Sequence, residues 1–248
     1  MENKTEFGII EPKFPVRNLL VVPHRNEKLQ VSYSAFGPDF FIKNIREMQK
    51  SYSHPTIGEK ISFKEPTTSE SISATAYDFG NLAKPEIFDS SWLQLGYIIK
   101  TSEGVFANPP KDSQGKTIMD EEILKNYLNK SKKINGIWLY NGKDARDFGF
   151  ASYETFKQGV QECDSFAKSG LARLLEHTKE KTAGNLREIA PPKFYKRGVN
   201  VRGFDSVKEP ILRVAGLVSI RGFDDYRLNV DGDIWDEDED GFAFGVLK

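Results

Sequence analysis

The acid-dense segment near the end of the chain has residue types and a spacing that could hold a cation. Asp236, Asp238 and Asp240 alternate and precede Gly241, as in the first half of a calcium loop, where the glycine permits a sharp turn. The closing bidentate carboxylate is missing, because its position falls on Leu247. A Ca²⁺ or Mg²⁺ ion serving a divalent-metal-dependent hydrolase would take its oxygen ligands from Asp231, Asp233, Asp236, Asp238 and Asp240.

A second interpretation of this segment needs no metal. Asp231-Gly232 is a common two-residue hairpin turn, and Asp231 and Asp233 reach the other carboxylates only if the hairpin folds back. Residues 236–241 then form a solvated acidic loop, as runs of like charge usually do. We favour the solvated loop and keep the metal site as an alternative.

The motif Arg-Gly-Phe-Asp occurs twice, at 202–205 and 221–224, inside a longer echo of residues 199–208 by residues 218–227. Two arginine forks could bind a phosphate or carboxylate while the glycines let the backbone approach. Basic and aromatic residues just upstream suit single-stranded nucleic acid, because bases stack on rings and cations contact phosphates. The candidate residues for this site are Lys193, Tyr195, Lys196, Arg197, Arg202, Arg221 and Arg227.

The same echo also has a purely structural explanation. In an alternating strand the phenylalanine points inward, and the arginine and aspartate form exposed cross-strand pairs. Strand periodicity by itself explains most of the match between the two copies. We therefore favour two similar strands over a duplicated anion site.

Asn108-Pro109-Pro110 is similar to the Asn-Pro-Pro-aromatic signature of amino-methyltransferases that act on nucleic acids. Lys111 replaces the aromatic residue, and no glycine-rich cofactor loop follows an early strand. We interpret the tripeptide as the end of a strand, since proline restricts the residue before it to extended backbone.

The remaining reactive residue types give no catalytic pattern. His24, His54 and His177 have no second histidine or acid at metal-ligand spacing on a helix face. A helix dipole explains His177 near a helix end, and Cys163 lies on an apolar stripe, where a buried thiol is expected. The sequence contains no nucleophile elbow, no Walker loop and no dinucleotide fingerprint, which favours a protein that is not an enzyme.

Composition bounds the class of protein more than its function. The 248 residues carry a formal net charge of −1, so nothing global indicates nucleic acid or an anionic membrane. The single cysteine excludes an intrachain disulfide framework. With no apolar run long enough for a membrane helix and no secretory signal at the start, we expect a soluble, cytoplasmic protein of microbial or viral origin.

Hydrophobic periodicity predicts an α+β fold with sheet elements at both ends. Strands are expected at 18–22, 29–34, 60–64 and 137–140, with a hairpin over 92–108. Helices are expected over 38–51, where Pro38 suits the first position, and over 117–128, after a capping box that begins at Thr117. Residues 66–70 fit either a loop or the capped entry to a helix through Tyr77, and residues 71–77 also alternate as a strand would, so that choice stays open.

The longest apolar stripe predicts one amphipathic helix over 152–176, in which Gly159 and Gly170 are unfavourable. After Pro192 the chain becomes β-rich, with strands expected at 199–204, 211–221, 227–230, 233–236 and 242–247. We expect the long helix to pack against this small antiparallel unit. No composition break marks a linker, so residues 1–248 are interpreted as a single α+β domain with an N-terminal arm (1–16) and a β-rich subregion (193–248).

Three function classes follow from these patterns. The first is a non-catalytic intracellular interaction or assembly protein, with a protein partner or a homo-oligomer and no membrane. The second is a nucleic-acid-associated protein that uses the Lys/Arg-Gly-aromatic surface at 193–227. The third is the metal-dependent hydrolase with its acidic cluster at 231–240. The absence of catalytic motifs favours the first class.

Overall fold

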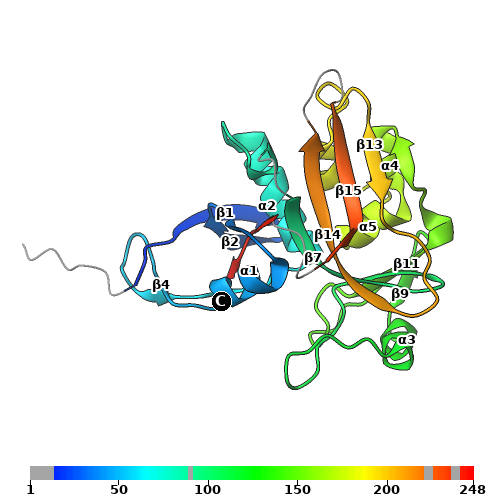
Figure 1. Cartoon of the computed structure of the whole chain (residues 1–248), viewed down its shortest axis with the longest axis horizontal. Coiled ribbons are helices and arrows are strands. Elements are labelled where there is room, and N and C mark those ends of the chain that lie inside the picture. Colours follow the sequence, from blue (N-terminus) through cyan, green and yellow to red (C-terminus); the bar gives the residue numbers. More distant parts are fainter. Residues whose placement is uncertain (1–13, 89–91, 221–225, 236–240) are drawn as a thin grey trace, which may run out of the picture.

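A computed structural model describes residues 14–88, 92–220, 226–235 and 241–248 of the chain. Helices and strands are both abundant, which confirms the α+β class. A smaller sheet with helix α1 and a larger sheet lie at opposite ends of the long axis, and helix α2 lies between them (Figure 1). None of the helices in the described part is both long enough and apolar enough to cross a membrane.

The larger sheet carries most of the strands. In spatial order they are β12 (Gly159–Gln161), β13 (Val199–Arg202), β15 (Arg227–Ile234), β14 (Ile211–Ile220), β7 (Trp92–Lys100), β8 (Gly104–Ala107), β11 (Gly149–Ser152), β10 (Ile137–Leu139) and β9 (Lys132–Ile134). Two further strands lie outside this order: β16 (Gly241–Ala243) pairs with β7, and β3 (Phe36–Asp39) pairs with β16. The described pairs are antiparallel except β13 with β15 and β16 with β7.

The smaller sheet contains both ends of the described chain. Its strand order is β1 (Asn18–His24), β2 (Glu27–Tyr33), β17 (Val246–Leu247) and β6 (Phe63–Lys64). A separate two-stranded ladder pairs β4 (Tyr52–Ser53) with β5 (Lys60–Ile61). Helix α1 (Phe41–Met48) packs its buried face mainly on β3 and β16 and also on β6, in a cluster that includes Phe36, Phe63 and Tyr97.

Helix α2 (Thr68–Asn81) resolves the choice left open for residues 66–77. Thr67 caps the helix with its side chain, and the Glu70 carboxylate accepts a hydrogen bond from the Thr67 amide at 2.8 Å. This capping box offsets the weak helix propensity of the Ser- and Thr-rich sequence. The helix is buried along most of its length against β1, β7 and helix α6 (Gly184–Ile189).

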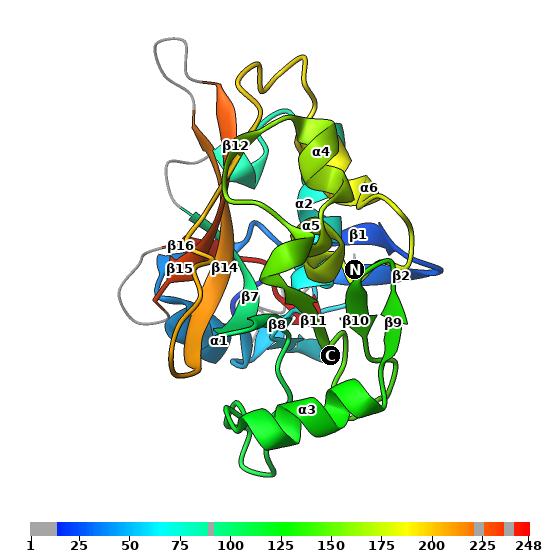
Figure 2. The ribbon, with the colours of Figure 1, turned by 90° about the vertical axis from the view of Figure 1, so that its right-hand side faces the viewer.

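The remaining helices lie on the larger sheet. Helix α5 (Gly170–Leu175) packs on β8, β10 and β11, and α4 (Cys163–Lys168) precedes it. Helix α3 (Glu121–Asn129) covers a separate aromatic cluster that includes Phe106 of β8 and Phe150 of β11 (Figure 2). Two short 3-10 helices, η1 (Glu86–Phe88) and η2 (Tyr153–Thr155), complete the described elements.

The expected helix over 152–176 is wrong. The segment is divided among the end of β11, η2, β12, α4 and α5. Gly159 has a φ of +87°, which no right-handed helix contains. Ser169 is extended and starts a new helix, since its Oγ accepts a hydrogen bond from the Ala172 amide at 3.2 Å. The stripe was misleading because residues from several elements enter one core at helical spacing, and Val160 is 56% exposed.

Other expectations need smaller corrections. Pro38 lies in β3, and α1 begins only at Phe41. Helix α3 is capped by Asp120, whose carboxylate accepts the Glu122 amide at 2.9 Å, so Thr117 is not its cap. The hairpin over 92–108 and strands β1, β2 and β10 are confirmed within one or two residues at most boundaries.

The β-rich end of the chain also differs from the expectation. Asp231-Gly232 lies inside β15 and is not a hairpin turn. Strand β13 runs parallel to β15, so the C-terminal unit is mixed and not purely antiparallel. In the described residues, 199–202 of the first copy lie in β13, which is parallel to β15, and 218–220 of the second copy lie in β14, which is antiparallel to β15. They therefore share a strand pattern but not a common orientation.

Candidate functional site

A buried carboxylate, Asp147, lies in the loop before β11 and receives hydrogen bonds from three side chains in two segments of the chain. Its Oδ1 accepts from Arg25 Nη1 at 2.8 Å. Its Oδ2 accepts from Thr67 Oγ1 at 2.7 Å and from Ser69 Oγ at 2.6 Å. The residue is only 7% exposed, so these donors replace the water that an ionised carboxylate requires.

Asn108, which ends strand β8, holds the same loop through its side-chain amide. The oxygen accepts the Thr68 amide at 2.8 Å, and the nitrogen donates to the Asp147 carbonyl at 2.9 Å and to Thr68 Oγ1 at 3.0 Å. All of these partners belong to the protein, so the amide holds the loop in place. The similarity to a methyltransferase signature therefore has a structural explanation.

His177 follows helix α5 and completes the arrangement. Its Nε2 donates to the Phe148 carbonyl at 3.2 Å, and its Nδ1 accepts from Arg25 Nη2 at 3.3 Å. Burial lowers the pKa of His177, while Asp147 opposes that shift. The hydrogen bonds agree with a neutral ring protonated on Nε2, since Nδ1 faces a guanidinium donor.

Four of these residues share an uncommon backbone conformation. Arg25, Asn108, Asp147 and His177 have φ values of 53°, 51°, 57° and 47°. Across the described residues only Asn135 joins them as a non-glycine residue with positive φ. Such conformations cost roughly 1–3 kcal/mol each and persist where surrounding contacts fix them. We call Arg25, Thr67, Ser69, Asn108, Asp147 and His177 the Asp147 cluster.

The electrostatics of the cluster favour an ionised Asp147. Burial by itself would raise the pKa of this carboxyl. The Arg25 guanidinium, with hydrogen bonds from Arg25 and Ser69, instead holds the pKa well below its usual range, and His177 adds to this effect only when its ring is protonated. The carboxylate therefore stays charged and bound to its donors, which suits a positioning role better than proton transfer.

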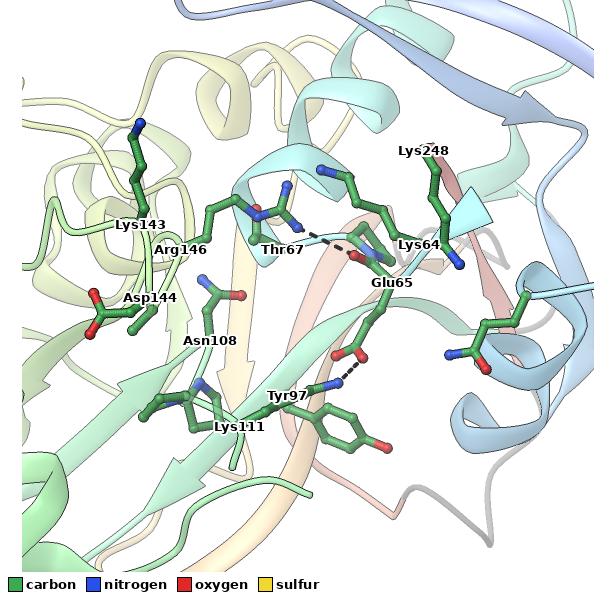
Figure 3. Close-up of a pocket in the computed structure, with 15 residues that line it drawn as sticks. Lys64, Glu65, Thr67, Tyr97, Asn108, Lys111, Lys143, Asp144, Arg146 and Lys248 are labelled. Carbon is green, nitrogen blue, oxygen red and sulfur yellow. Dashed lines mark hydrogen bonds and ion pairs between the residues drawn. The ribbon is translucent and has the colours of Figure 1, made fainter. Parts of the chain in front are cut away.

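A cavity of about 370 Å³ opens beside the cluster (Figure 3). Its walls come from residues 64–67 before α2, residues 108–111 after β8, residues 143–146 before Asp147, and Gln49, Tyr97 and Lys248. Five side chains in this lining are cationic, namely Lys64, Lys111, Lys143, Arg146 and Lys248. Two are anionic, namely Glu65 and Asp144. The lining thus has an excess of three positive side-chain charges.

Several of these cationic side chains form ion pairs with carboxylates. Lys111 contacts the Glu65 carboxylate, and Arg146 contacts Glu70 (Figure 3 shows the first pair as a dashed line). Lys64 lies 3.7 Å from the same Glu70 oxygen that Arg146 contacts. Lys64 and Arg146 thus share one buried carboxylate, and these two cations together with Glu70 keep a net positive charge.

The residues expected to bind nucleic acid are spread over β13, β15 and the loop before them. Tyr195 is 1% exposed and cannot stack on a base. The Arg197 amide bonds the Tyr226 carbonyl, so Arg197 lies near Arg227 at one end of β13. Arg202 lies at the other end, opposite Asp231. Arg221 falls outside the described residues.

The residues expected to bind a metal already have cationic partners where they are described. Asp231 accepts from Arg202 Nε at 2.7 Å, and Asp233 accepts from Lys100 at 2.6 Å and Arg213 at 2.9 Å. In the described segments no group of three His, Cys, Asp or Glu side chains could hold a metal ion. Asp236, Asp238 and Asp240 lie outside the described residues.

Gly203 has a reason to be glycine that involves no ligand. Its φ is +74°, and a Cβ there would lie 2.5 Å from Asp231 Oδ1 and 2.8 Å from the Asp233 Cβ. The glycine therefore lets the chain pass close over β15. Gly222, its counterpart in the echo, lies outside the described residues.

Sequence reasoning missed the Asp147 cluster because its members come from five separate segments. The turn before β2 was expected to be merely polar, and residues 143–147 carried no motif. The one usable signal was chemical, since Asn, Asp and His adopt left-handed backbone more often than other side chains. Compared with known proteins, the chain matches no family model, no curated protein and no solved structure.

Proposed function

We propose that the protein binds a small phosphate-bearing ligand in the cavity beside the Asp147 cluster. The observation that carries the proposal is the excess of cationic side chains around one concave surface of about 370 Å³. Lysine and arginine are the side chains that bind phosphate oxygens most strongly, because each hydrogen bond is charge-assisted. Lys64, Lys143 and Arg146 are the groups that we assign to the phosphate.

The Asp147 cluster supports this role by fixing the rim of the cavity. Arg146 immediately precedes Asp147, and Asn108 ties the same loop to the start of α2. A binding group that is already ordered loses less conformational freedom when the ligand arrives. The four residues with left-handed backbone therefore belong to the cluster that holds the loop with Lys143 and Arg146 in place.

The size and charge of the site favour a small ligand over a nucleic acid. Pockets for small molecules occupy about 300–1,000 Å³, and this cavity falls within that range. A nucleic-acid backbone would need cations along an extended track. Here the excess charge surrounds a single concavity, while the whole chain has a net charge of −1.

Glu65 acts as an internal counter-ion in this proposal. Its carboxylate contacts Lys111 within the cavity lining, and a bound phosphate would compete for the same ammonium group. Replacing Glu65 with glutamine should therefore tighten phosphate binding. The expected gain is several-fold, about 1 kcal/mol, which is typical of a partly exposed ion pair.

Isothermal titration with inorganic phosphate and with pyrophosphate tests the proposal. The wild-type protein should bind both, and pyrophosphate should bind more tightly because it carries more charge. A Lys143→Gln/Arg146→Gln variant should lose at least about tenfold in affinity, equivalent to about 1.4 kcal/mol. An Arg202→Gln/Arg213→Gln variant removes two cations from the larger sheet and should bind as the wild type does.

Absence of binding at millimolar concentrations, or equal losses in the two double variants, would contradict the proposal. A single-stranded oligonucleotide is a further titrant. If it binds while pyrophosphate does not, and its affinity falls steeply with salt, the nucleic-acid interpretation replaces ours. A non-catalytic interaction or assembly role is compatible with ligand binding and stays a prediction, which the oligomeric state of the isolated chain tests.

A further inference from the structure

A second cavity, of about 330 Å³, is lined in part by Arg25 and His177 of the Asp147 cluster. Its lining includes His24, Ser73, Glu176, His177 and Asn185. His24 and Ser73 are each 4% exposed, and His177 is 7% exposed. These buried polar side chains have hydrogen-bond partners within the protein, so the wall of the cavity is held in place before a ligand arrives.

A third cavity, of about 310 Å³, joins the first two through shared residues. It shares Lys143 and Arg146 with the phosphate cavity. It shares Arg25, Asn141 and His177 with the second cavity. Ser69 of the Asp147 cluster and Ser73 of the second cavity are one turn apart on α2, about 6 Å along the helix axis. One ligand of modest length can therefore contact both the phosphate cavity and the second cavity.

The wall of the second cavity contains both hydrogen-bond donors and hydrogen-bond acceptors. Ser73 Oγ lies 2.9 Å from His24 Nδ1 and accepts from Asn185 Nδ2 at 3.1 Å. The Glu176 carboxylate accepts the amides of Asn185 and Leu186 at 3.3 Å and 3.1 Å. Hydroxyl groups both donate and accept, so they match such a wall better than purely donating or accepting groups do.

The lining of the second cavity does not favour a nucleobase as the group that binds there. Among the described residues that form this cavity there is no Phe, Tyr or Trp ring. Bases gain much of their binding energy by stacking on such rings. A polyhydroxylated group instead gains from hydrogen bonds to hydroxyl, amide and carboxylate side chains.

We propose that the ligand is a sugar phosphate or a similar phosphorylated polyol, whose hydroxyl-bearing part occupies the second cavity while Lys143 and Arg146 hold its phosphate. This inference rests on the proposed function, because it assigns the remainder of the same ligand. Asn141 and Asn185 would bind hydroxyl groups. Arg25 lies between the two parts of the ligand.

Calorimetric titrations with ribose 5-phosphate, glucose 6-phosphate, phenyl phosphate and inorganic phosphate test the inference. Phenyl phosphate is the matched control, since it carries the same charged group on a planar apolar ring. At least one sugar phosphate should bind about tenfold more tightly than phenyl phosphate. Equal or weaker binding of both sugar phosphates would overturn the inference.

Variants connect the preference to the second cavity. Asn185→Ala and the more exposed Asn141→Ala should each weaken sugar-phosphate binding several-fold and leave inorganic phosphate binding unchanged. Asn200→Ala, which removes a hydrogen bond to Asn229 on the larger sheet, should change neither affinity. If the two cavity variants keep the full preference, the second cavity is not the sugar site.

The two proposals fail in different ways. Inorganic phosphate that binds with no preference for a sugar phosphate removes only the sugar assignment. Inorganic phosphate that does not bind removes the phosphate site and the sugar assignment with it. The unfolding temperature of each variant, measured without ligand, shows whether a lost affinity reflects a lost fold.

Discussion

The protein pairs aspartate with arginine in two regions that differ in backbone conformation and, at Asp233, in the burial of the carboxylate. At the Asp147 cluster, a buried carboxylate accepts hydrogen bonds from loops and a helix start, with left-handed backbone at four residues. On the larger sheet, Asp231 and Asp233 meet Arg202, Arg213 and Lys100 across extended strands. The side chain of Asp233 is 50% exposed there.

The comparison shows that an ion pair acquires its role from its surroundings. Cross-strand pairs on a sheet add about 0.2–1 kcal/mol each and need no unusual backbone. The Asp147 cluster instead fixes segments that regular secondary structure does not hold, next to a basic cavity. Strained backbone that is maintained beside a cavity is typical of functional sites.

The largest expected difference between the two regions is in the cost of neutralising the carboxylate. Asp147→Asn should lower the free energy of unfolding by about 3 kcal/mol, because it weakens three charge-assisted hydrogen bonds in a buried place. Asp233→Asn, at the half-exposed sheet position, should cost about 1 kcal/mol or less. Urea unfolding of both variants measures the difference, and equal losses would contradict it.

The second prediction concerns the close approach of backbone on the sheet. Gly203→Ala should lower the free energy of unfolding by about 2 kcal/mol, since it places a side chain in left-handed backbone and against Asp231. Phosphate affinity should be unchanged, because Gly203 does not line the cavity. A variant with normal stability, or one with weakened phosphate binding, would contradict this structural role.

The two regions differ in how well the sequence predicts them, because only regular secondary structure produces a periodic pattern of apolar residues. Alternation of apolar residues predicted β13, β14 and part of β15, and a capped helix entry at residues 66–70 was among the alternatives for α2. The expected helix over 152–176 failed because apolar spacing does not reveal the breaks at Gly159 and Ser169. Local patterns thus predicted elements but not their boundaries or pairing.

The candidate site was not predictable in the same way. Arg25, Asn108, Asp147 and His177 are brought together only by tertiary folding, and no short motif connects them. Asn108 attracted attention for a catalytic signature, whereas its amide serves the loop. The sequence favoured residues 193–227 and 231–240, where repetition and charge density are conspicuous. Periodicity and ion pairing explain those features in the described residues.

The third prediction uses pH to separate the regions. The folded pKa values of His24 and His177 are lowered, chiefly by burial. Both rings bind protons more readily when the chain unfolds. The free energy of unfolding should therefore fall as the pH drops below the unfolded value of about 6.5, by on the order of 1 kcal/mol per ring.

His177→Gln should reduce this acid-side loss, and Asp233→Asn should leave the loss between pH 7 and pH 5 nearly intact. Unfolding curves at a series of pH values measure both. At lower pH the lowered pKa of Asp147 adds a further loss, since protons bind the unfolded carboxyl first, near a pKa of about 3.9. A wild-type stability that rises between pH 7 and pH 5 would contradict the account.

The smallest expected effect is on the sheet. Arg213 lies 3.5 Å from the centroid of the Trp235 ring, which is half exposed. Trp235→Leu should cost about 0.5–1 kcal/mol, as partly exposed cation–π pairs do, and should not alter phosphate affinity. A large loss of affinity would instead move the functional surface from the cavity to the sheet.

The central claim, that the cavity beside Asp147 binds phosphate, is tested most directly by thermal unfolding with and without phosphate at constant ionic strength. Phosphate at one hundred times its Kd should stabilise the wild type by about 2.7 kcal/mol, a rise of about 5–10 °C in Tm. The Arg202→Gln/Arg213→Gln variant should show the same rise, and the Lys143→Gln/Arg146→Gln variant should show about half of it or less, because a tenfold weaker Kd leaves about 1.4 kcal/mol of stabilisation at the same phosphate concentration. A rise that is equal in all three proteins, or absent from the wild type, would contradict the claim.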